Sequence, residues 1–141
     1  MKDCVFCHPE KLDIIAENDL ALAFHDACPV SRGHCLVIPK RHVEQYFAAT
    51  AEEHAAMVNL IFNVRQQLEE KFSPDGYNIG SNIGFDAGQT IFHFHIHIIP
   101  RYHGDVIDPR GGIRKVIPTR SHHRQYRKDS PLSFEEHTQE P

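Results

Sequence analysis

Hydrophobic residues and histidines alternate strictly in residues 92–98 of the chain. A period of two is typical of a β-strand, in which successive side chains point to opposite faces. The pattern predicts a strand with a row of imidazoles about 6.5–7 Å apart on one face and a hydrophobic core behind the other. The histidines of this row are His93, His95 and His97, and the predicted core side is made of Phe92, Phe94, Ile96 and Ile98.

A hairpin near the N-terminus is predicted by two apolar-rich segments, residues 13–17 and 20–26, which flank a short polar turn. Apolar side chains alternate along the second segment, so we expect them on one face of the hairpin. These side chains are Leu20, Leu22 and Phe24.

Two further strands are expected in the middle of the chain. Residues 35–38 form a continuous apolar run that stops at Pro39, which is typical of a central strand buried on both faces. Residues 77–83 alternate and lead through a glycine-bearing loop into the histidine strand. The short loop predicts that these two strands are antiparallel, with Asn82 and Gln89 at the same end of the sheet.

One long amphipathic helix is predicted over residues 51–71. Thr50 and Glu53 have the spacing of a capping box, in which each side chain accepts a hydrogen bond from the other residue's backbone N–H. Residues 73–76 contain the Pro and Gly that end the helix. Its apolar positions recur at helical spacing and are Met57, Ile61, Val64 and Leu68.

These elements predict an α+β fold with an antiparallel sheet of about five strands. One long helix packs on the sheet, and a short helix is expected near residues 42–47. The length of 141 residues and the mass of 16.2 kDa suit one domain, which we place at residues 1–118. Residues 119–141 have little apolar content, so we predict a polar tail there that is flexible or draped on a partner subunit.

Charge and hydropathy exclude some classes of function. A formal charge of −4 and a pI near 6.3 argue against a broad basic surface for nucleic acid. No apolar run approaches the roughly 18 residues of a membrane span, and the first residues do not lead into the apolar region of a signal peptide. We therefore expect a cytoplasmic protein with neither a membrane nor a nucleic-acid partner.

Two of the four cysteines have a spacing that carries chemistry. In a reducing compartment, Cys4-x-x-Cys7 indicates a metal-binding or redox pair more than a structural disulfide. A redox pair belongs at the start of a βαβ unit, and no strand precedes this one, so zinc is favoured. Cys28 and Cys35 lack such spacing and are predicted to be small buried apolar residues.

The three histidines at two-residue spacing also predict chemistry, because a polar row is costly unless satisfied and protonated neighbours repel. One interpretation is a metal site, since imidazoles at this spacing can share an ion. The other is nucleophilic and acid–base chemistry on a phosphate. The spacing alone leaves both interpretations open.

The flanks of the histidine row add a resemblance to a known family. Gly-Gln-Thr at residues 88–90 precedes the row, and Pro-Arg at residues 100–101 follows it. Together with the alternation, these residues resemble the signature of the histidine triad (HIT) superfamily. Residues 29–34 and 36–42, together with Asn82, are similar to other parts of the family pattern, so the resemblance covers most of the proposed domain.

Two features narrow the resemblance. The pair Cys4 and Cys7 is similar to that of the CxxC-containing group of HIT proteins. The segment 104–105 (Gly-Asp) and residues 109–118 are closer to the diadenosine polyphosphate hydrolase, or fragile histidine triad, side of the family. The resemblance implies a HIT-like fold and a nucleotide substrate.

The activity that the resemblance implies is nucleotide hydrolysis or transfer at the α-phosphate of dinucleoside polyphosphates or nucleoside phosphoramidates. His95 is implied as the nucleophile that forms a nucleotidyl-histidine intermediate. Its attacking nitrogen is free only if its other nitrogen carries the proton, and the resemblance assigns that proton's acceptor as the carbonyl of His93. His97 and Gln89 are implied as donors toward the phosphate oxygens or the leaving group.

Nucleotide binding is implied for a second set of residues. Asp26 would accept hydrogen bonds from ribose hydroxyls, with His25 beside it. His34 matches a family histidine behind the nucleophile, and Asn82 is expected near the phosphate end of the site. Ile14, Leu22 and Phe24 are candidates for a base pocket, but they are equally well explained as core residues.

The resemblance also implies a structural Zn²⁺, no organic cofactor and a homodimer in which two sheets join. The implied zinc ligands are Cys4, Cys7, His42 and His93, a closed set that leaves no position for a catalytic water. Two other functions remain open from the sequence. One is a zinc hydrolase with the metal held by His93, His95 and His97, and the other is a nucleotide-binding regulator with little turnover.

Overall fold

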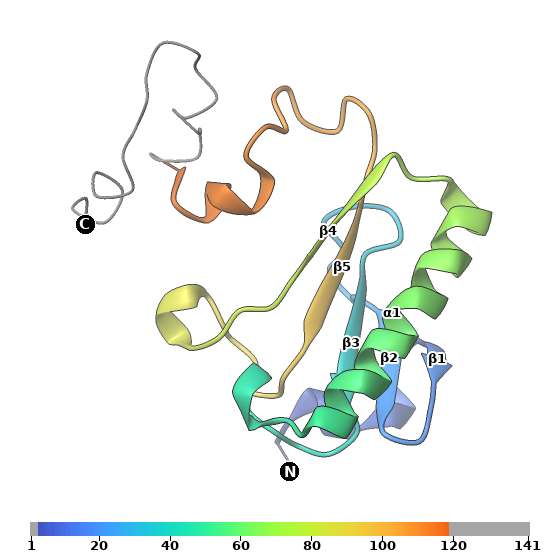
Figure 1. Ribbon diagram of the computed structural model, residues 1–141, viewed down its shortest axis with the longest axis vertical. Coiled ribbons are helices and arrows are strands. Elements are labelled where there is room, and N and C mark those ends of the chain that lie inside the picture. Colours follow the sequence, from blue (N-terminus) through green and yellow to red (C-terminus); the bar gives the residue numbers. More distant parts are fainter. Residues whose placement is uncertain (1–2, 119–141) are drawn as a thin grey trace. The chain divides into compact units, whose positions relative to one another are not determined.

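Five strands form one sheet in the order β1-β2-β3-β5-β4, and every neighbouring pair is antiparallel (Figure 1). This computed structural model describes residues 3–118. The predicted α+β class with one antiparallel sheet is therefore confirmed. The strands are β1 (Ile14–Glu17), β2 (Ala21–His25), β3 (Cys35–Pro39), β4 (Gly76–Gly80) and β5 (Ile96–Arg101).

Strand β3 lies at the centre of the sheet, and all of its residues are buried. Its continuous apolar sequence fits this position, because both of its faces are covered. Pro39 is its last residue, where a missing backbone N–H costs the sheet no further hydrogen bond. The prediction of a central strand is confirmed.

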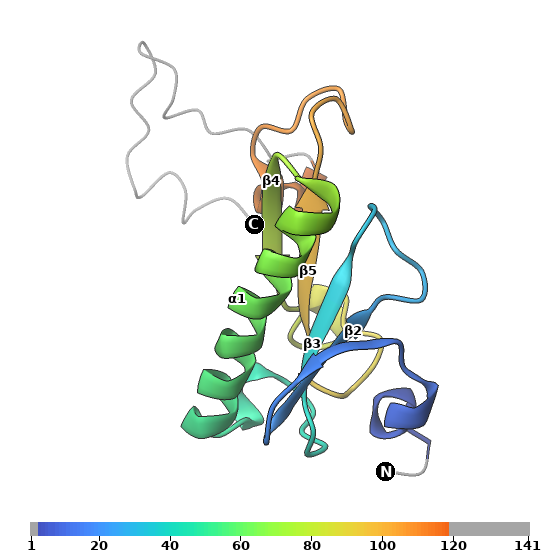
Figure 2. The same cartoon turned by 90° about the vertical axis from the view of Figure 1, so that its right-hand side faces the viewer.

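The long helix α1 (Ala51–Phe72) covers one face of the sheet (Figure 2). Thr50 and Glu53 form the predicted capping box in both directions, with hydrogen bonds of 3.1 and 3.0 Å. The helix ends where Ser73 adopts the left-handed conformation. Met57, Val64 and Leu68 are buried as predicted, whereas Ile61 is half-buried and Leu60 takes a core position beside it.

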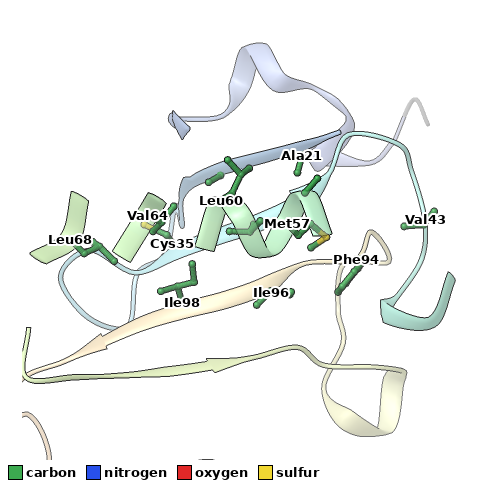
Figure 3. Packing of buried hydrophobic residues seen from close by; sticks show 13 residues of the cluster. Ala21, Cys35, Val43, Met57, Leu60, Val64, Leu68, Phe94, Ile96 and Ile98 are labelled. Carbon is green, nitrogen blue, oxygen red and sulfur yellow. The ribbon is translucent and has the colours of Figure 1, made fainter. Parts of the chain in front are cut away.

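Alternate residues of the central strands separate two hydrophobic layers. Ala21, Ala23, Cys35 and Val37 pack with α1 in the larger cluster, which Figure 3 shows together with residues of β5. The residues between them point to the other face, where the N-terminal 3-10 helices Val5–Cys7 and Pro9–Lys11 lie (Figure 2). That second layer contains Phe6, Leu22, Phe24, Leu36 and Ile38.

The histidine segment differs from the predicted strand at its start. β5 begins only at Ile96, because the backbone N–H of Phe94 bonds to the carbonyl of Val43 at 2.7 Å in place of a sheet neighbour. Phe94 and Ile96 face the core as predicted, but Phe92 is 44 % exposed, so its predicted core position is wrong. The row of histidines is also not an open face, since His93 and His95 are buried.

Three smaller details add to the expectations or differ from them. Cys35 is buried as expected, but Cys28 is exposed in the loop between β2 and β3, because this loop turns outward after β2. Leu20 is 40 % exposed, since it lies in the turn before β2 begins at Ala21. The short helix expected at residues 42–47 is a 3-10 helix at Tyr46–Ala48.

Contacts divide the chain into two units, Met1–Asp105 and Val106–Pro141. The five strands and α1 belong to the first unit, and the described part of the second contains a 3-10 helix at Gly112–Val116. The domain limits of 1–118 stay a prediction, and the tail 119–141 lies outside the described residues. Within residues 3–118, no helix has the length and apolar content to span a membrane.

Candidate functional site

The first cluster at the site joins the N-terminal cysteines to two histidines from distant parts of the chain. The backbone N–H of Cys7 bonds to the carbonyl of Cys4 at 3.0 Å, and this turn points both thiols the same way. Sγ of Cys4 lies 3.4 Å from Nδ1 of His93, and Sγ of Cys7 lies 3.3 Å from Nδ1 of His42. The four predicted metal ligands thus have ligand atoms within 4.8 Å of one another.

The protonation of this cluster suits a metal. Nε2 of His93 lies 2.9 Å from the carbonyl of Pro39 and donates to it, so Nδ1 presents a lone pair to the thiols. Burial lowers the pKa of His93, which keeps the ring in the neutral, ligating form. Burial raises the pKa of Cys4, and the hydrogen bond with Cys7 raises it further, so a nearby cation is needed to hold Cys4 as the ligating thiolate. Two sulfurs and two nitrogens are the donor set of a tetrahedral zinc site.

His42 is held in place by the start of α1. The neighbouring Arg41 donates two hydrogen bonds, of 3.2 and 2.7 Å, to the carboxylate of Glu53. That carboxylate also closes the capping box, and Arg41 lowers its pKa. The segment from Pro39 to His42 is therefore tied at one end to β3 and at the other to the first turn of the helix.

His95 lies between this cluster of cysteines and histidines and a second cluster, which contains His34 and His97. Its Nδ1 lies 2.8 Å from the carbonyl of His93 and donates to it, so Nε2 carries a lone pair. Among residues 3–118, Nε2 of His95 makes no hydrogen bond. The ring is 7 % exposed and packs edge-on against Phe6 at 5.3 Å and against His97 at 5.1 Å, measured between ring centroids. The hydroxyl of Ser81 donates to the carbonyl of His95 at 2.8 Å and fixes the backbone there.

The second cluster lies on the other side of His95. Nε2 of His34 is 2.9 Å from Nδ1 of His97 and 3.5 Å from Oδ2 of Asp26. Burial lowers the pKa of His34 against the opposing effect of Asp26. Burial, together with His95 and His34, lowers the pKa of His97 to about 4, so both rings are neutral at neutral pH.

The loop before β3 positions His34. Gly33 has a φ of 87° and lies so close to α1 that a Cβ would be 2.7 Å from Cδ2 of Leu68, so this turn requires glycine. Asp26 stabilises the same loop, because its Oδ1 accepts a hydrogen bond of 2.8 Å from the backbone N–H of Cys28. The second carboxylate oxygen remains directed toward His34.

The other predicted site residues lie at different distances from this centre. His25 ends β2, and its Nδ1 is 3.7 Å from Sγ of Cys35. Asn82 lies near Gly88, since a Cβ on that glycine would be 3.9 Å from Nδ2 of Asn82. Leu22 and Phe24 are buried in the second hydrophobic layer, while Ile14 is 37 % exposed.

Gln89 is more deeply buried than a phosphate donor requires. It is 1 % exposed, and its Oε1 accepts from the backbone N–H of Gly84 at 2.9 Å. Its amide nitrogen donates to the carbonyls of Glu44 at 2.6 Å and Ile91 at 3.1 Å. The side chain thus fastens the loop before the histidines to the segment before α1, and its contact with a phosphate stays a prediction.

The sequence reasoning missed two residues that contact this centre. Phe6 packs against both His93 and His95, and Ser81 bonds the His95 carbonyl. Phe6 lies between the two cysteines in the sequence, so a metal bound by Cys4, Cys7 and the histidines would place the Phe6 side chain near those histidines. The sequence position of Phe6 therefore indicated this contact, whereas no local pattern marks Ser81.

Comparison with known proteins agrees with this geometry. The HIT domain family matches residues 9–104. A HIT-like protein of Mycoplasma genitalium is 42 % identical in an alignment over 103 residues, and the match covers 70 % of this chain and 73 % of that protein. The adenosine 5'-monophosphoramidase of Schizosaccharomyces pombe is 39 % identical over 102 residues, covering 70 % of this chain and 74 % of that enzyme.

Solved structures give the same result. The zinc-bound histidine triad family protein of Mycobacterium smegmatis superimposes with a TM-score of 0.69 at 35 % sequence identity. The match covers 76 % of this chain and 81 % of that structure. Two clusters with histidines lie on either side of the buried His95 on this sheet, and the family match and the relatives agree with this arrangement. The chain belongs to the HIT family.

Proposed function

We propose that this protein is a nucleotide hydrolase or transferase that cleaves at an α-phosphate through a nucleotidyl-histidine on His95. The observation that carries the proposal is the hydrogen bond of 2.8 Å from Nδ1 of His95 to the carbonyl of His93. This bond leaves a lone pair on Nε2, in a ring held between Phe6 and His97. A neutral imidazole fixed in this tautomer is ready to attack phosphorus.

The reaction follows in two displacements. Nε2 of His95 forms a bond to the α-phosphorus while the bond to the leaving group breaks, and the leaving group departs with its electron pair and takes up a proton. Water then attacks the same phosphorus and loses a proton, the P–N bond breaks with its electron pair returning to Nε2, and the nucleoside monophosphate is released. His97 would donate from Nε2 to a phosphate oxygen, which stabilises the charge that develops in each transition state.

Two substrate classes are proposed, nucleoside phosphoramidates and dinucleoside polyphosphates. The relative from Schizosaccharomyces pombe is an adenosine 5'-monophosphoramidase, which supports the first class. The second comes from the similarity of residues 104–105 and 109–118 to the diadenosine polyphosphate hydrolase side of the family. Asp26 would accept from ribose hydroxyls, with His25 and Asn82 bordering the nucleotide.

A structural zinc is part of the proposal, held by Cys4, Cys7, His42 and His93. When bound, it would supply a rigid link between the N-terminus and the sheet and no hydrolytic chemistry, because four protein ligands fill a tetrahedral site. The alternative in which one metal sits on the three histidines of the row has less support. His93 directs Nδ1 to the thiols, while His95 directs Nδ1 to a backbone carbonyl.

We also propose that the protein is a cytoplasmic homodimer.

The test is to trap the intermediate. Wild-type protein is mixed with adenosine phosphoramidate or diadenosine polyphosphate labelled in the α-phosphate, and the reaction is quenched rapidly. Label that is stable in base and labile in acid is expected on the protein, as a phosphoramidate bond requires. His103→Ala is the matched control, because His103 is exposed and belongs to neither side-chain cluster, and it should trap label normally.

Absence of trapped label under every quench condition, together with inversion at phosphorus, would show a single displacement by water. That result would remove His95 as the nucleophile and favour the zinc hydrolase. Tight binding of a mononucleotide with no turnover of any substrate in the panel would instead favour the nucleotide-binding regulator.

A further inference from the structure

The hydrogen bonds of His34 determine where the proton on His97 resides. The backbone N–H of Val30 donates to Nδ1 of His34 at 3.1 Å. A ring nitrogen that accepts a hydrogen bond carries no proton, so neutral His34 carries its proton on Nε2. Nε2 lies 2.9 Å from Nδ1 of His97, so His34 donates and His97 accepts. The proton of neutral His97 is then on Nε2.

The location of this proton matters because either ring nitrogen of a neutral imidazole can carry it. Toward a phosphate oxygen it can present either an N–H, which attracts, or a lone pair, which repels. His95 and His97 need opposite tautomers in the proposed reaction, since the first must attack and the second must donate. The backbone provides both: the carbonyl of His93 acts directly on His95, and the N–H of Val30 acts on His97 through His34.

We propose that His34 is a positioning residue that fixes the Nε2–H tautomer of His97. This inference rests on the proposed function, in which Nε2 of His97 donates to the phosphate. Among the residues that the structure describes, Nε2 of His97 has no hydrogen-bond partner, so it is available to a ligand. His34 is 3 % exposed, which protects its two hydrogen bonds from competition with water.

The same geometry argues against a proton relay through His34. If Nε2 gave its proton to His97, the ring would become an anion, because its Nδ1 faces a backbone N–H that cannot supply a replacement. Asp26 does not change this, since its Oδ2, at 3.5 Å, faces the same Nε2 and can only accept that proton. His34 therefore acts as a fixed donor.

The geometry also argues against a second metal site at this cluster. The ligand atoms of Asp26, His34 and His97 lie within 4.8 Å of one another, which is close enough to share an ion. A metal on Nε2 of His34 would need a lone pair there and would move the proton to Nδ1. That proton would face the N–H of Val30, and two donors would meet at 3.1 Å.

The direct test is nitrogen NMR of the wild-type protein with labelled histidines at neutral pH. Two-bond correlations from the ring carbons' hydrogens identify the protonated nitrogen of each ring, and single-histidine variants assign the signals. The Nε2–H tautomer is expected for His34 and His97, and the Nδ1–H tautomer for His95. A proton on Nδ1 of His97 in the wild-type protein overturns the proposal.

Two substitutions of His34 then separate positioning from a general structural role. His34→Gln keeps an amide N–H that can face Nδ1 of His97, whereas His34→Leu fills similar space without a donor. We expect His34→Leu to release His97 into a mixture of tautomers and to lower kcat by about 10- to 100-fold, with KM changed by less than about 3-fold. His34→Gln should retain most of the wild-type kcat and the wild-type tautomer.

A double-mutant cycle completes the test. In a His97→Leu background, His34→Leu should cost little further activity, because the residue through which it acts has been removed. Equal losses in His34→Gln and His34→Leu with an unchanged His97 tautomer would overturn the proposal, as would additive losses in the cycle. If wild-type protein turns over no nucleotide, the proposed function fails, while the NMR result still decides the tautomer.

Discussion

Two clusters flank His95, and they share a residue type but differ in what surrounds it. In the thiol cluster, formed by Cys4, Cys7, His42 and His93, Nδ1 of His93 faces the two thiols. In the carboxylate cluster, formed by Asp26, His34 and His97, Nδ1 of His97 faces the imidazole of His34, which in turn lies beside the carboxylate of Asp26. In each case, the partner of one ring nitrogen decides what the other can do. The three histidines have identical spacing along the chain, so their different roles come from the groups that bind their ring nitrogens.

The sharpest way to break this comparison is to remove the residue between the clusters. His95→Ala should lower kcat on the order of 10⁴-fold or more, because no other described group presents a lone pair at the same place. Folding and zinc content should be unchanged, since the ring is not one of the predicted ligands. Steady-state kinetics and metal analysis measure the two effects. Residual turnover near the wild-type rate would contradict the role of His95.

The thiol cluster should affect stability more than chemistry. Cys4→Ser should reduce zinc from about one ion per chain and lower the free energy of unfolding on the order of several kcal/mol, because metal binding contributes directly to folding. Urea melts and metal analysis of protein prepared without chelators measure this. Cys28→Ser is the matched control, because Cys28 is exposed and outside both clusters. Wild-type protein that contains no metal would remove the zinc proposal.

The carboxylate cluster should affect substrate selection. Asp26→Ala should weaken ribonucleotide binding by roughly 1.5–3 kcal/mol and narrow the gap to the deoxynucleotide, since a charge-assisted hydrogen bond to the ribose is lost. Calorimetric titration of both nucleotides measures the ratio. Because Oδ1 also accepts from the N–H of Cys28, Asp26→Asn serves as a control that retains an acceptor for the loop. An unchanged ratio would leave Asp26 with a structural role alone.

The smallest expected effect is a difference in acid sensitivity between the clusters. The pKa of His97 is lowered to about 4, so between pH 4 and the ordinary value of about 6.5 the unfolded chain binds more protons at this residue than the folded protein. Stability therefore rises with pH across this window, by at most about 1.4 kcal/mol per pH unit from one group.

His97→Gln should flatten this slope, and His103→Gln should not. Urea melts at several pH values between 4.5 and 7.5 measure the difference, and the zinc ligands are the same in all three proteins. A slope that is equal in wild type and His97→Gln would show that His97 does not titrate as its surroundings indicate.

Most of the fold could be predicted from the sequence, because it depends on local patterns. The continuous run of β3, the alternation of β4 and β5 and the capping box of α1 each specify an element within a few residues. The four residues of the thiol cluster also came together as expected. The cysteines and the two histidines are far apart along the chain, and the CxxC spacing together with the family resemblance predicted that they would come together.

The failures occurred where a long-range contact overrides the local pattern. Phe92 continues the alternation but is exposed, because the chain there bonds to Val43 and has not yet joined the sheet. Gln89 is a polar residue beside the histidines, yet three hydrogen bonds to the loops bury it. Neither partner is marked by any regular spacing in the sequence, so neither contact could be read from the sequence.

The contact between Cys4 and His93 spans 89 positions along the chain, and this separation has a consequence for folding kinetics. Closing so long a loop costs entropy that the intervening hairpins and α1 must first reduce. The turn that carries Phe6 therefore reaches the histidines only after β3 and β5 have paired. Formation of the complete site should be the slowest step of refolding, and the appearance of activity should lag behind the recovery of secondary structure.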